Sequence, residues 1–303
     1  MGALMQLVAF LTRVVSVAML ISQAQWLWGS TVAFLYALDG DVAALQKAGA
    51  VEVRNFSVGG TVVRQLALDG HTVHAVRMGS GCVQTALAAQ ALLAKQKCDL
   101  VISVGPVGDI KGELETGRWY VINRVVAWQR GSRDDAGFRL HADARMAVAR
   151  HPLLEGAGGV LAGMPGIGVA SGEVFISCDS FRAELASLSG CAAVDMNLFG
   201  LLSVLQSHGL GGIHLRTPSD RADSKAGGDF RRFTESYDGA GGRMAAEIIR
   251  SMPRDPTSPQ AHDALRGMLK AADSREPRSR IPRSGTAKDV PADPAGVPGR
   301  SAD

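Results

Sequence analysis

Two stretches of the chain are mostly apolar over the length of a single strand. They are residues 31–38, TVAFLYAL, and residues 98–105, CDLVISVG. Continuous apolar runs of this length are typical of strands that are covered on both faces. Between them, residues 51–58, 61–68 and 72–78 alternate apolar and polar positions and are separated by Gly-Gly and Asp-Gly turns. This second pattern predicts antiparallel or edge strands.

Helical and strand patterns alternate along the rest of the chain. Strands that alternate with helices, some of them apolar on both faces, indicate an α/β fold. We therefore expect a single-domain three-layer α/β/α sandwich around a mixed β-sheet. The further expected elements are helices at residues 82–96, 178–188, 198–209 and 241–252, and strands at 118–128, 191–196 and in the segment leading into 214–220.

The N-terminal end differs from the centre of the chain. The 303 residues are 46% hydrophobic and 20% charged, which is enough apolar material for a full core. Residues 1–29 carry one charge, Arg13, and the apolar run after it resembles a signal peptide with an acceptable cleavage site at Ser22-Gln23-Ala24. An incorrectly chosen start codon would give the same appearance. Localisation therefore stays open: periplasmic or exported if residues 1–24 are a signal peptide, and cytoplasmic otherwise.

The C-terminal end differs as well. Residues 253–303 hold eight of the twelve prolines and few large apolar side chains. Such a segment cannot bury enough surface to offset the entropy lost on ordering, so we expect a disordered tail. The expected organisation is a hydrophobic segment at 1–29, one folded domain at 30–252 and the tail at 253–303.

Charge and motifs argue against several functions. The net charge is +3, of which about +1 lies outside the tail, so the folded part lacks the basic stripe of a nucleic-acid-binding protein. The sequence contains neither a P-loop nor a GxGxxG motif, and Ser80 does not lie in a GxSxG motif. The four cysteines are scattered, without ligand-like spacing. We expect no metal, no cofactor, no nucleic-acid partner and no lipid partner.

Polar residues near the expected strand ends are the remaining candidates for chemistry. Asp39 and Asp41 follow the first buried strand, and Gly105 ends the second. The segment HLRTPSDRAD, residues 214–223, concentrates charge where a further strand should end at Asp220. Functional residues of α/β folds gather at such ends, and carboxylates without a metal or cofactor point to proton transfer. A surface turn is the alternative interpretation.

Four segments in this order resemble the nucleoside phosphorylase and nucleosidase superfamily, most closely the methylthioadenosine/S-adenosylhomocysteine nucleosidases. The similarity runs from about Val32 to Met252. It implies a nucleoside phosphorylase-like fold, an N-glycosidic bond as the target, a nucleoside substrate and a homodimer. The segments are YALDGDV, VISVGPVGD, ASGEVFIS with AAVDMN, and RTPSDRAD followed by FRRF.

The resemblance also implies catalytic roles. Asp220 matches the acid that protonates the purine as the bond breaks, which requires a raised pKa. Asp41 aligns with a glutamate that activates the attacking water, and Arg216 matches an arginine near that water. Without the resemblance, the alternative interpretations are a helix cap or turn for Asp220, a turn for Asp41 and a strand-end salt bridge for Arg216.

The same comparison implies a set of substrate-binding residues. Phe175 and Ile176 match positions that hold the base, and Met196 matches a methionine under the ribose. Ser219, beside the predicted acid, is placed in the same site. Asn197 stands where the family has a glutamate that accepts from both ribose hydroxyls. Aromatic and methionine side chains are also ordinary core residues, so packing is the alternative role of Phe175 and Met196.

Three departures from the family pattern fall around the ribose and water site. Asp41 is one methylene shorter than glutamate, and Pro106 replaces a serine and so offers neither a hydroxyl nor an N–H group. Asn197 has a single acceptor oxygen, and its NH2 group can only donate. Hydrolysis of a purine nucleoside is the leading interpretation. A phosphate-dependent phosphorylase and a nucleoside-binding protein without catalysis stay open as alternatives.

Overall fold

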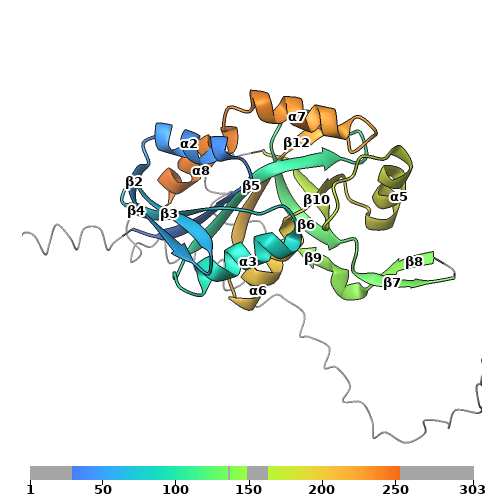
Figure 1. Ribbon diagram of the computed structural model, residues 1–303, viewed down its shortest axis with the longest axis horizontal. Coiled ribbons are helices and arrows are strands. Elements are labelled where there is room, and N and C mark those ends of the chain that lie inside the picture. The colour runs from blue at the N-terminus through green and yellow to red at the C-terminus, as the bar shows by residue number, and fades with distance from the viewer. Residues whose placement is uncertain (1–28, 136, 149–162, 253–303) are drawn as a thin grey trace, which may run out of the picture.

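The computed structural model describes residues 29–135, 137–148 and 163–252. The tail at 253–303 and the N-terminal segment up to residue 28 lie outside the described residues, so both stay predictions. In the described part, a mixed sheet lies between helices on its two faces (Figure 1). This arrangement confirms the predicted three-layer α/β/α sandwich.

Ten of the described strands form one sheet, with the order β11-β10-β6-β12-β5-β1-β4-β3-β2 and with β9 paired to β6. β1 and β12 both run parallel to β5, whereas β3 runs antiparallel to its two neighbours, β2 and β4. The strands are β1 (Thr31–Tyr36), β2 (Val51–Val58), β3 (Thr61–Leu68), β4 (His71–Arg77), β5 (Leu100–Asp109), β6 (Tyr120–Ala127), β9 (Arg145–Ala147), β10 (Gly166–Ser171), β11 (Ala193–Asp195) and β12 (Gly212–Asp220). The sequence pattern thus predicted both the buried centre and the antiparallel end of the sheet.

Successive residues of β1 point into two different cores. Phe34 packs with side chains of helices α2 (Asp39–Lys47) and α8 (Ala240–Ser251), whereas Leu35 packs with those of α3 (Cys82–Leu93) and α6 (Leu198–Ser207). Alternation along a strand places neighbouring side chains on opposite faces, so β1 must be apolar throughout. The remaining described elements are α5 (Asp179–Ser189), α7 (Ala226–Ser236), the hairpin of β7 (Gly131–Asp134) and β8 (Gly137–Leu140), and the short 3₁₀ helix η2 (Ala142–Ala144).

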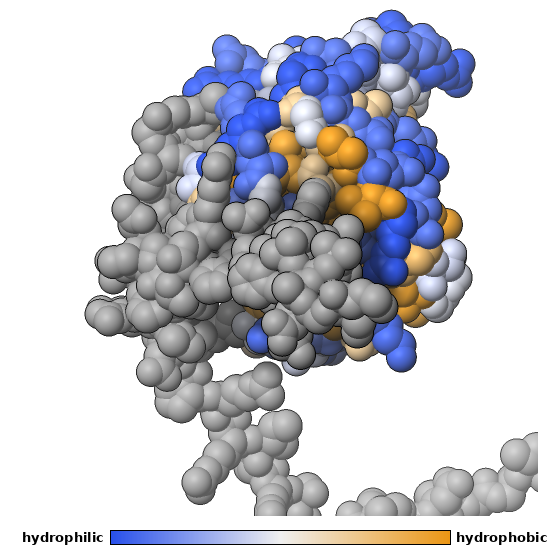
Figure 2. All heavy atoms as spheres, turned by 90° about the vertical axis from the view of Figure 1, so that its left-hand side faces the viewer, coloured by the Kyte–Doolittle hydropathy of each residue, from blue (hydrophilic) through white to orange (hydrophobic). Residues whose placement is uncertain are grey.

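Strand β2 ends the sheet and exposes apolar side chains. Val51 and Val53 of β2 and Val62 of the neighbouring β3 are each more than half exposed. Figure 2 faces this end of the molecule and shows apolar side chains gathered among hydrophilic ones. None of the helices in the described residues is long and apolar enough to cross a membrane.

Several local expectations were wrong. Asp39 and Asp41 open helix α2 rather than a turn, and acidic residues are favourable in a first helical turn because of the helix dipole. Gly105 lies inside β5, because the pairing with β12 continues beyond it to Gly108 and the strand ends at Asp109. Helix α7, which contains FRRF, was not expected, because its Gly-rich start and polar surface give little helical signal.

Candidate active site

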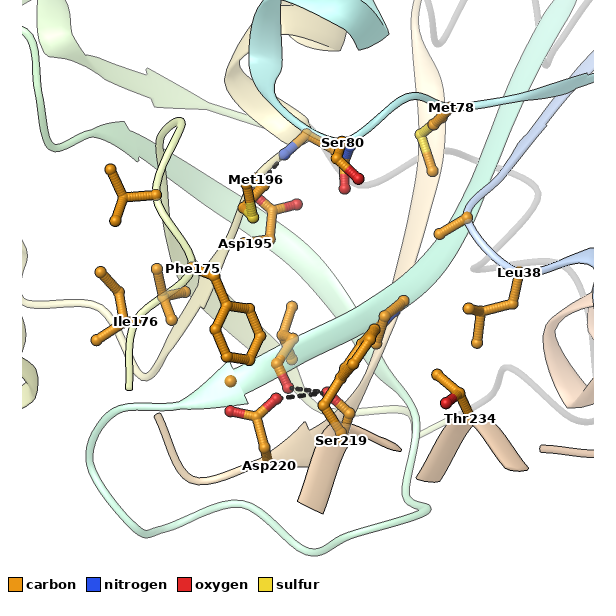
Figure 3. A pocket seen from close by; sticks show the side chains of 18 of the residues that line it. Leu38, Met78, Ser80, Phe175, Ile176, Asp195, Met196, Ser219, Asp220 and Thr234 are labelled. Atoms are coloured by element: carbon orange, nitrogen blue, oxygen red, sulfur yellow. Dashed lines mark hydrogen bonds between the residues drawn. The ribbon is translucent and has the colours of Figure 1, made fainter. Parts of the chain in front are cut away.

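A cavity of about 440 Å3 opens at the carboxyl ends of the parallel strands. In Figure 3, Phe175 and Ile176 lie on one side of it, and Leu38, Met78 and Thr234 lie on the opposite side. Asp195 and Met196 lie across the cavity from Ser219 and Asp220. The structure therefore brings together six predicted residues: Phe175, Ile176, Met196, Asn197, Ser219 and Asp220.

Asp220 ends β12 in the cavity wall and is only 7% exposed. A register shift between Pro218 and Asp220 aligns it with Gly108 of β5, where a Cβ atom would lie 3.0 Å from Oδ1 of the carboxyl group. The Ser219 hydroxyl donates to Oδ2 at 2.8 Å, and the Ala222 N–H group donates to Oδ1 at 2.9 Å. Burial is the largest influence and raises the pKa of Asp220, against these two hydrogen bonds. A carboxyl group in this setting is suited to carry and release a proton.

Aromatic side chains lie beside this carboxyl group. Phe175 and Phe230 of α7 both line the cavity, and their rings meet edge to face with centroids 5.8 Å apart. Phe175 is 40% exposed. Flat aromatic ligands pack favourably against such rings, so this end of the cavity fits a heteroaromatic base.

Arg216 acts on the cavity only through a neighbour. Its guanidinium group is buried and does not line the cavity, but Nε lies 3.3 Å from Oδ2 of Asp195, which does. Nη1 donates to the Ser103 hydroxyl oxygen at 3.3 Å. Burial lowers the pKa of Arg216, and the charge of Asp195 opposes this shift. The predicted strand-end salt bridge is thus present, and its carboxylate partner is the group that reaches the cavity.

Asp41 lies outside the cavity lining. The Tyr237 hydroxyl donates to its Oδ1 at 2.5 Å, and the Gly242 N–H group donates to the same atom at 3.1 Å. The close approach of α8 requires glycine, because a Cβ atom on Gly242 would lie 1.8 Å from the backbone oxygen of Asp41. Sequence reasoning expected this carboxyl group at the reacting centre. The structure instead holds it against the start of α8.

The environment of Asp41 is unusual for a carboxyl group. It is fully buried, and Oδ2 has no hydrogen-bond partner among the described residues. Burial raises the pKa of Asp41 to about 6, although the bonds from Tyr237 and Gly242 and the charge of Arg216 act in the opposite direction. This pKa is well above the range of an ordinary aspartate.

Several residues that line the cavity were assigned no place in the site from the sequence. Asp195 was quoted in AAVDMN without a role, and Phe230 was quoted in FRRF in the same way. Thr234 lies one helical turn after Phe230 on α7, and Arg77 ends β4 at the cavity. Their participation depends on where α7 and β4 lie, which the sequence patterns did not reveal. In the described part of the chain, no group of three or more His, Cys, Asp or Glu side chains is arranged to hold a metal ion.

The fold and cavity define a class: an α/β protein with a cavity of small-molecule size at the carboxyl ends of the parallel strands of a mixed sheet. The family model of the phosphorylase superfamily matches residues 31–252. The chain belongs to this superfamily, as the sequence segments predicted.

The known relatives have low sequence identity to this chain. The 5'-methylthioadenosine/S-adenosylhomocysteine nucleosidase of Mycobacterium bovis is 24% identical over 211 residues, which cover 60% of this chain and 82% of that protein. The structure of futalosine hydrolase from Helicobacter pylori matches with a TM-score of 0.64 and 18% identity, over 74% of this chain and 98% of that chain. A nucleosidase structure from Neisseria meningitidis, in complex with methylthio-immucillin-A, matches with a TM-score of 0.62 and 22% identity, over 74% of this chain and all of that chain.

The raised pKa of Asp41 predicts a pH-dependent stability difference. A carboxyl group whose folded pKa exceeds its unfolded value stabilises the fold at low pH, and this contribution is lost as pH rises through the folded value of about 6. Relative to Asp41→Asn, the wild-type free energy of unfolding should fall by roughly 1–3 kcal/mol between pH 4.5 and 7.5. Chemical denaturation of both proteins at the two pH values measures this change.

The neighbouring Asp39→Asn variant is the control. Its side chain is largely exposed, so it should follow the wild type at both pH values. A constant difference between Asp41→Asn and wild type across this range would show that Asp41 has an ordinary pKa.

Proposed function

We propose that this protein is a nucleosidase, which hydrolyses the N-glycosidic bond of a purine nucleoside such as methylthioadenosine or adenosylhomocysteine and releases the base. The observation that carries the proposal is Asp220, a buried carboxyl group with a raised pKa beside aromatic rings in the cavity wall. Superfamily membership supports it, as do the nucleosidases among the relatives.

We infer one orientation for the nucleoside from the residues that line the cavity. In this orientation the base lies between Phe175 and Asp220, which places the sugar near Met196 and Asn197. The substituent at the sugar's 5' carbon then points toward the opposite side, where Leu38 and its neighbours form an apolar wall. Bond cleavage leaves an oxocarbenium-like sugar and an anionic base, and Asp220 donates the proton that neutralises the base.

The role of Asp41 as the water-activating group stays a prediction. Its pKa of about 6 suits a general base at neutral pH, and Oδ2 is the atom with free lone pairs. Its position outside the cavity lining weighs against this role, as does the lack of donor groups at Pro106. The same two observations favour the alternative of a nucleoside-binding protein without catalysis.

Hydrolysis is favoured over phosphorolysis by the charges around the cavity. A phosphate nucleophile needs cationic groups, and Arg77 is the single Lys or Arg among the described residues that line the cavity. Arg77 is itself paired with Asp39 at 3.5 Å, and both side chains are mostly exposed. Phosphorolysis would be recognised by base release that requires added phosphate.

Asp220→Asn should reduce base release by about 100- to 10,000-fold while leaving nucleoside affinity largely intact. The amide can still hydrogen-bond to the purine but cannot give up a proton, so the loss lies in the transition state. Release of free base from a nucleoside panel, with calorimetric Kd values for the same nucleosides, measures both effects.

Asp223→Asn is the matched control. Asp223 lies outside the cavity lining, and its Oδ1 accepts from the Lys225 N–H group, which an asparagine oxygen can also do. If Asp220→Asn releases base as fast as the wild type, Asp220 is a turn residue and the proposed mechanism is wrong. If the wild-type protein binds nucleosides but never releases base, it is a binding protein.

Asp41→Asn tests the water-activating role in the same assay. Loss of a general base should lower kcat by at least about 100-fold. In the wild type, kcat/KM should rise with pH through about 6, because a base acts only when deprotonated. Normal turnover by Asp41→Asn, with altered stability alone, would assign Asp41 to the packing of α8.

We also propose a homodimer in which a second copy covers the open side of the cavity. Val83 and Leu87 lie four residues apart on α3 and are each 59% exposed. The Glu173 carboxylate accepts from the Val83 N–H group, which brings this face next to the half-exposed Phe175. Together these apolar side chains continue the cavity wall onto the surface.

Leu87→Glu should convert the dimer to a monomer in analytical ultracentrifugation and weaken nucleoside binding. Val62→Glu is the control, because Val62 is equally exposed but lies on β3, toward the β2 end of the sheet. A wild-type protein that is monomeric at micromolar concentration would contradict the dimer.

A further inference from the structure

The side chain of Asn197 is fixed in one orientation. Nδ2 lies 2.7 Å from the Gly79 carbonyl oxygen and 2.7 Å from Oγ1 of Thr85. A backbone carbonyl oxygen can only accept, so the NH2 group of Asn197 must face it. The chemistry of its partners thus determines which way the amide points.

Thr85 completes this arrangement. It is fully buried in α3, and its hydroxyl donates to the Gly79 carbonyl oxygen at 3.2 Å, so a lone pair of Oγ1 is free to accept from Asn197. Both amide N–H groups are therefore used inside the protein. The carbonyl oxygen Oδ1 is the one polar atom of this side chain left for a ligand.

The adjacent carboxylate does not add a second acceptor. Asp195 accepts from the backbone N–H groups of Asn197 and Leu198 and from the Arg216 guanidinium group. Its side chain is only 1% exposed. This part of the wall thus presents a single neutral acceptor to the cavity.

We propose, on the basis of the proposed function, that the amide oxygen of Asn197, oriented by Thr85, accepts a hydrogen bond from one sugar hydroxyl. The protein therefore also accepts nucleosides that lack the other sugar hydroxyl. Two hydroxyls of a ribose are best matched by the paired oxygens of a carboxylate, whereas one amide oxygen aligns with one donor. Loss of the hydroxyl that bonds to Asn197 leaves the desolvated amide oxygen unpaired, whereas loss of the other hydroxyl does not. The substrate class therefore extends to deoxynucleosides. Thr85 is a positioning residue, since it acts through Asn197.

The test compares adenosine with 2'-deoxyadenosine and 3'-deoxyadenosine. Kd values are measured by calorimetry in an Asp220→Asn background, in which the ligand is not consumed. One of the two deoxynucleosides should bind at least about tenfold more weakly than adenosine, and the other should bind within about threefold. Binding rather than turnover is measured because a deoxysugar also changes the intrinsic reactivity of the bond.

Thr85→Val provides the specific readout. It keeps the shape of the side chain but removes one of the two acceptors that hold the Asn197 amide, which leaves Oδ1 less firmly oriented. The tenfold ratio of Kd values should therefore fall to about threefold or less. Thr85→Ser keeps the hydroxyl and should keep the ratio. Asn197→Ala, which removes the acceptor directly, should abolish the ratio and serves if Thr85→Val does not fold.

Two results would overturn the inference while leaving the proposed function intact. One is equal, strong discrimination against both deoxynucleosides, and the other is an unchanged ratio in both Thr85→Val and Asn197→Ala. If none of the three nucleosides binds, the proposed function fails and the inference fails with it.

Discussion

The parallel pairing of β5 with β1 and with β12 is the constraint on which the rest of the structure depends. It brings three strand ends to one edge of the sheet, although they are far apart in the sequence. Because β1 and β5 are covered on both faces, they cannot slip in register without exposing apolar side chains or burying polar ones. Asp220 reaches the cavity because β12 pairs with β5 as far as Pro218 and then shifts register, which places Asp220 opposite Gly108.

Burial then separates the polar groups into two sets. Asp195 and Arg216 pair with each other, which satisfies charges that would be costly to bury alone. Asp41 and Asp220 have no such cationic partner in direct contact, so burial raises the pKa of each. Carboxyl groups with a raised pKa are suited to acid–base catalysis, and of these two only Asp220 lines the cavity.

Departures from the family pattern have distinct physical consequences here. Asp41 is held by Tyr237 and the close start of α8, whereas the Asn197 amide is held by Thr85 and the Gly79 carbonyl group. In the proposed mechanism, the first change affects how water is activated and the second affects which sugar is recognised. The two substitutions can therefore be tested independently.

The sequence alone determined the sheet centre, most of the helices and the group of residues around Asp220. Hydrophobic periodicity reports directly on which faces are covered, and motif order carries the family pattern. It did not determine that Asp41 lies outside the cavity lining, or that Phe230 and Thr234 belong to it. Those outcomes depend on contacts between segments roughly 200 residues apart, such as the Tyr237–Asp41 hydrogen bond. Only the tertiary structure decided them, because local patterns record burial but not which distant side chain provides the partner.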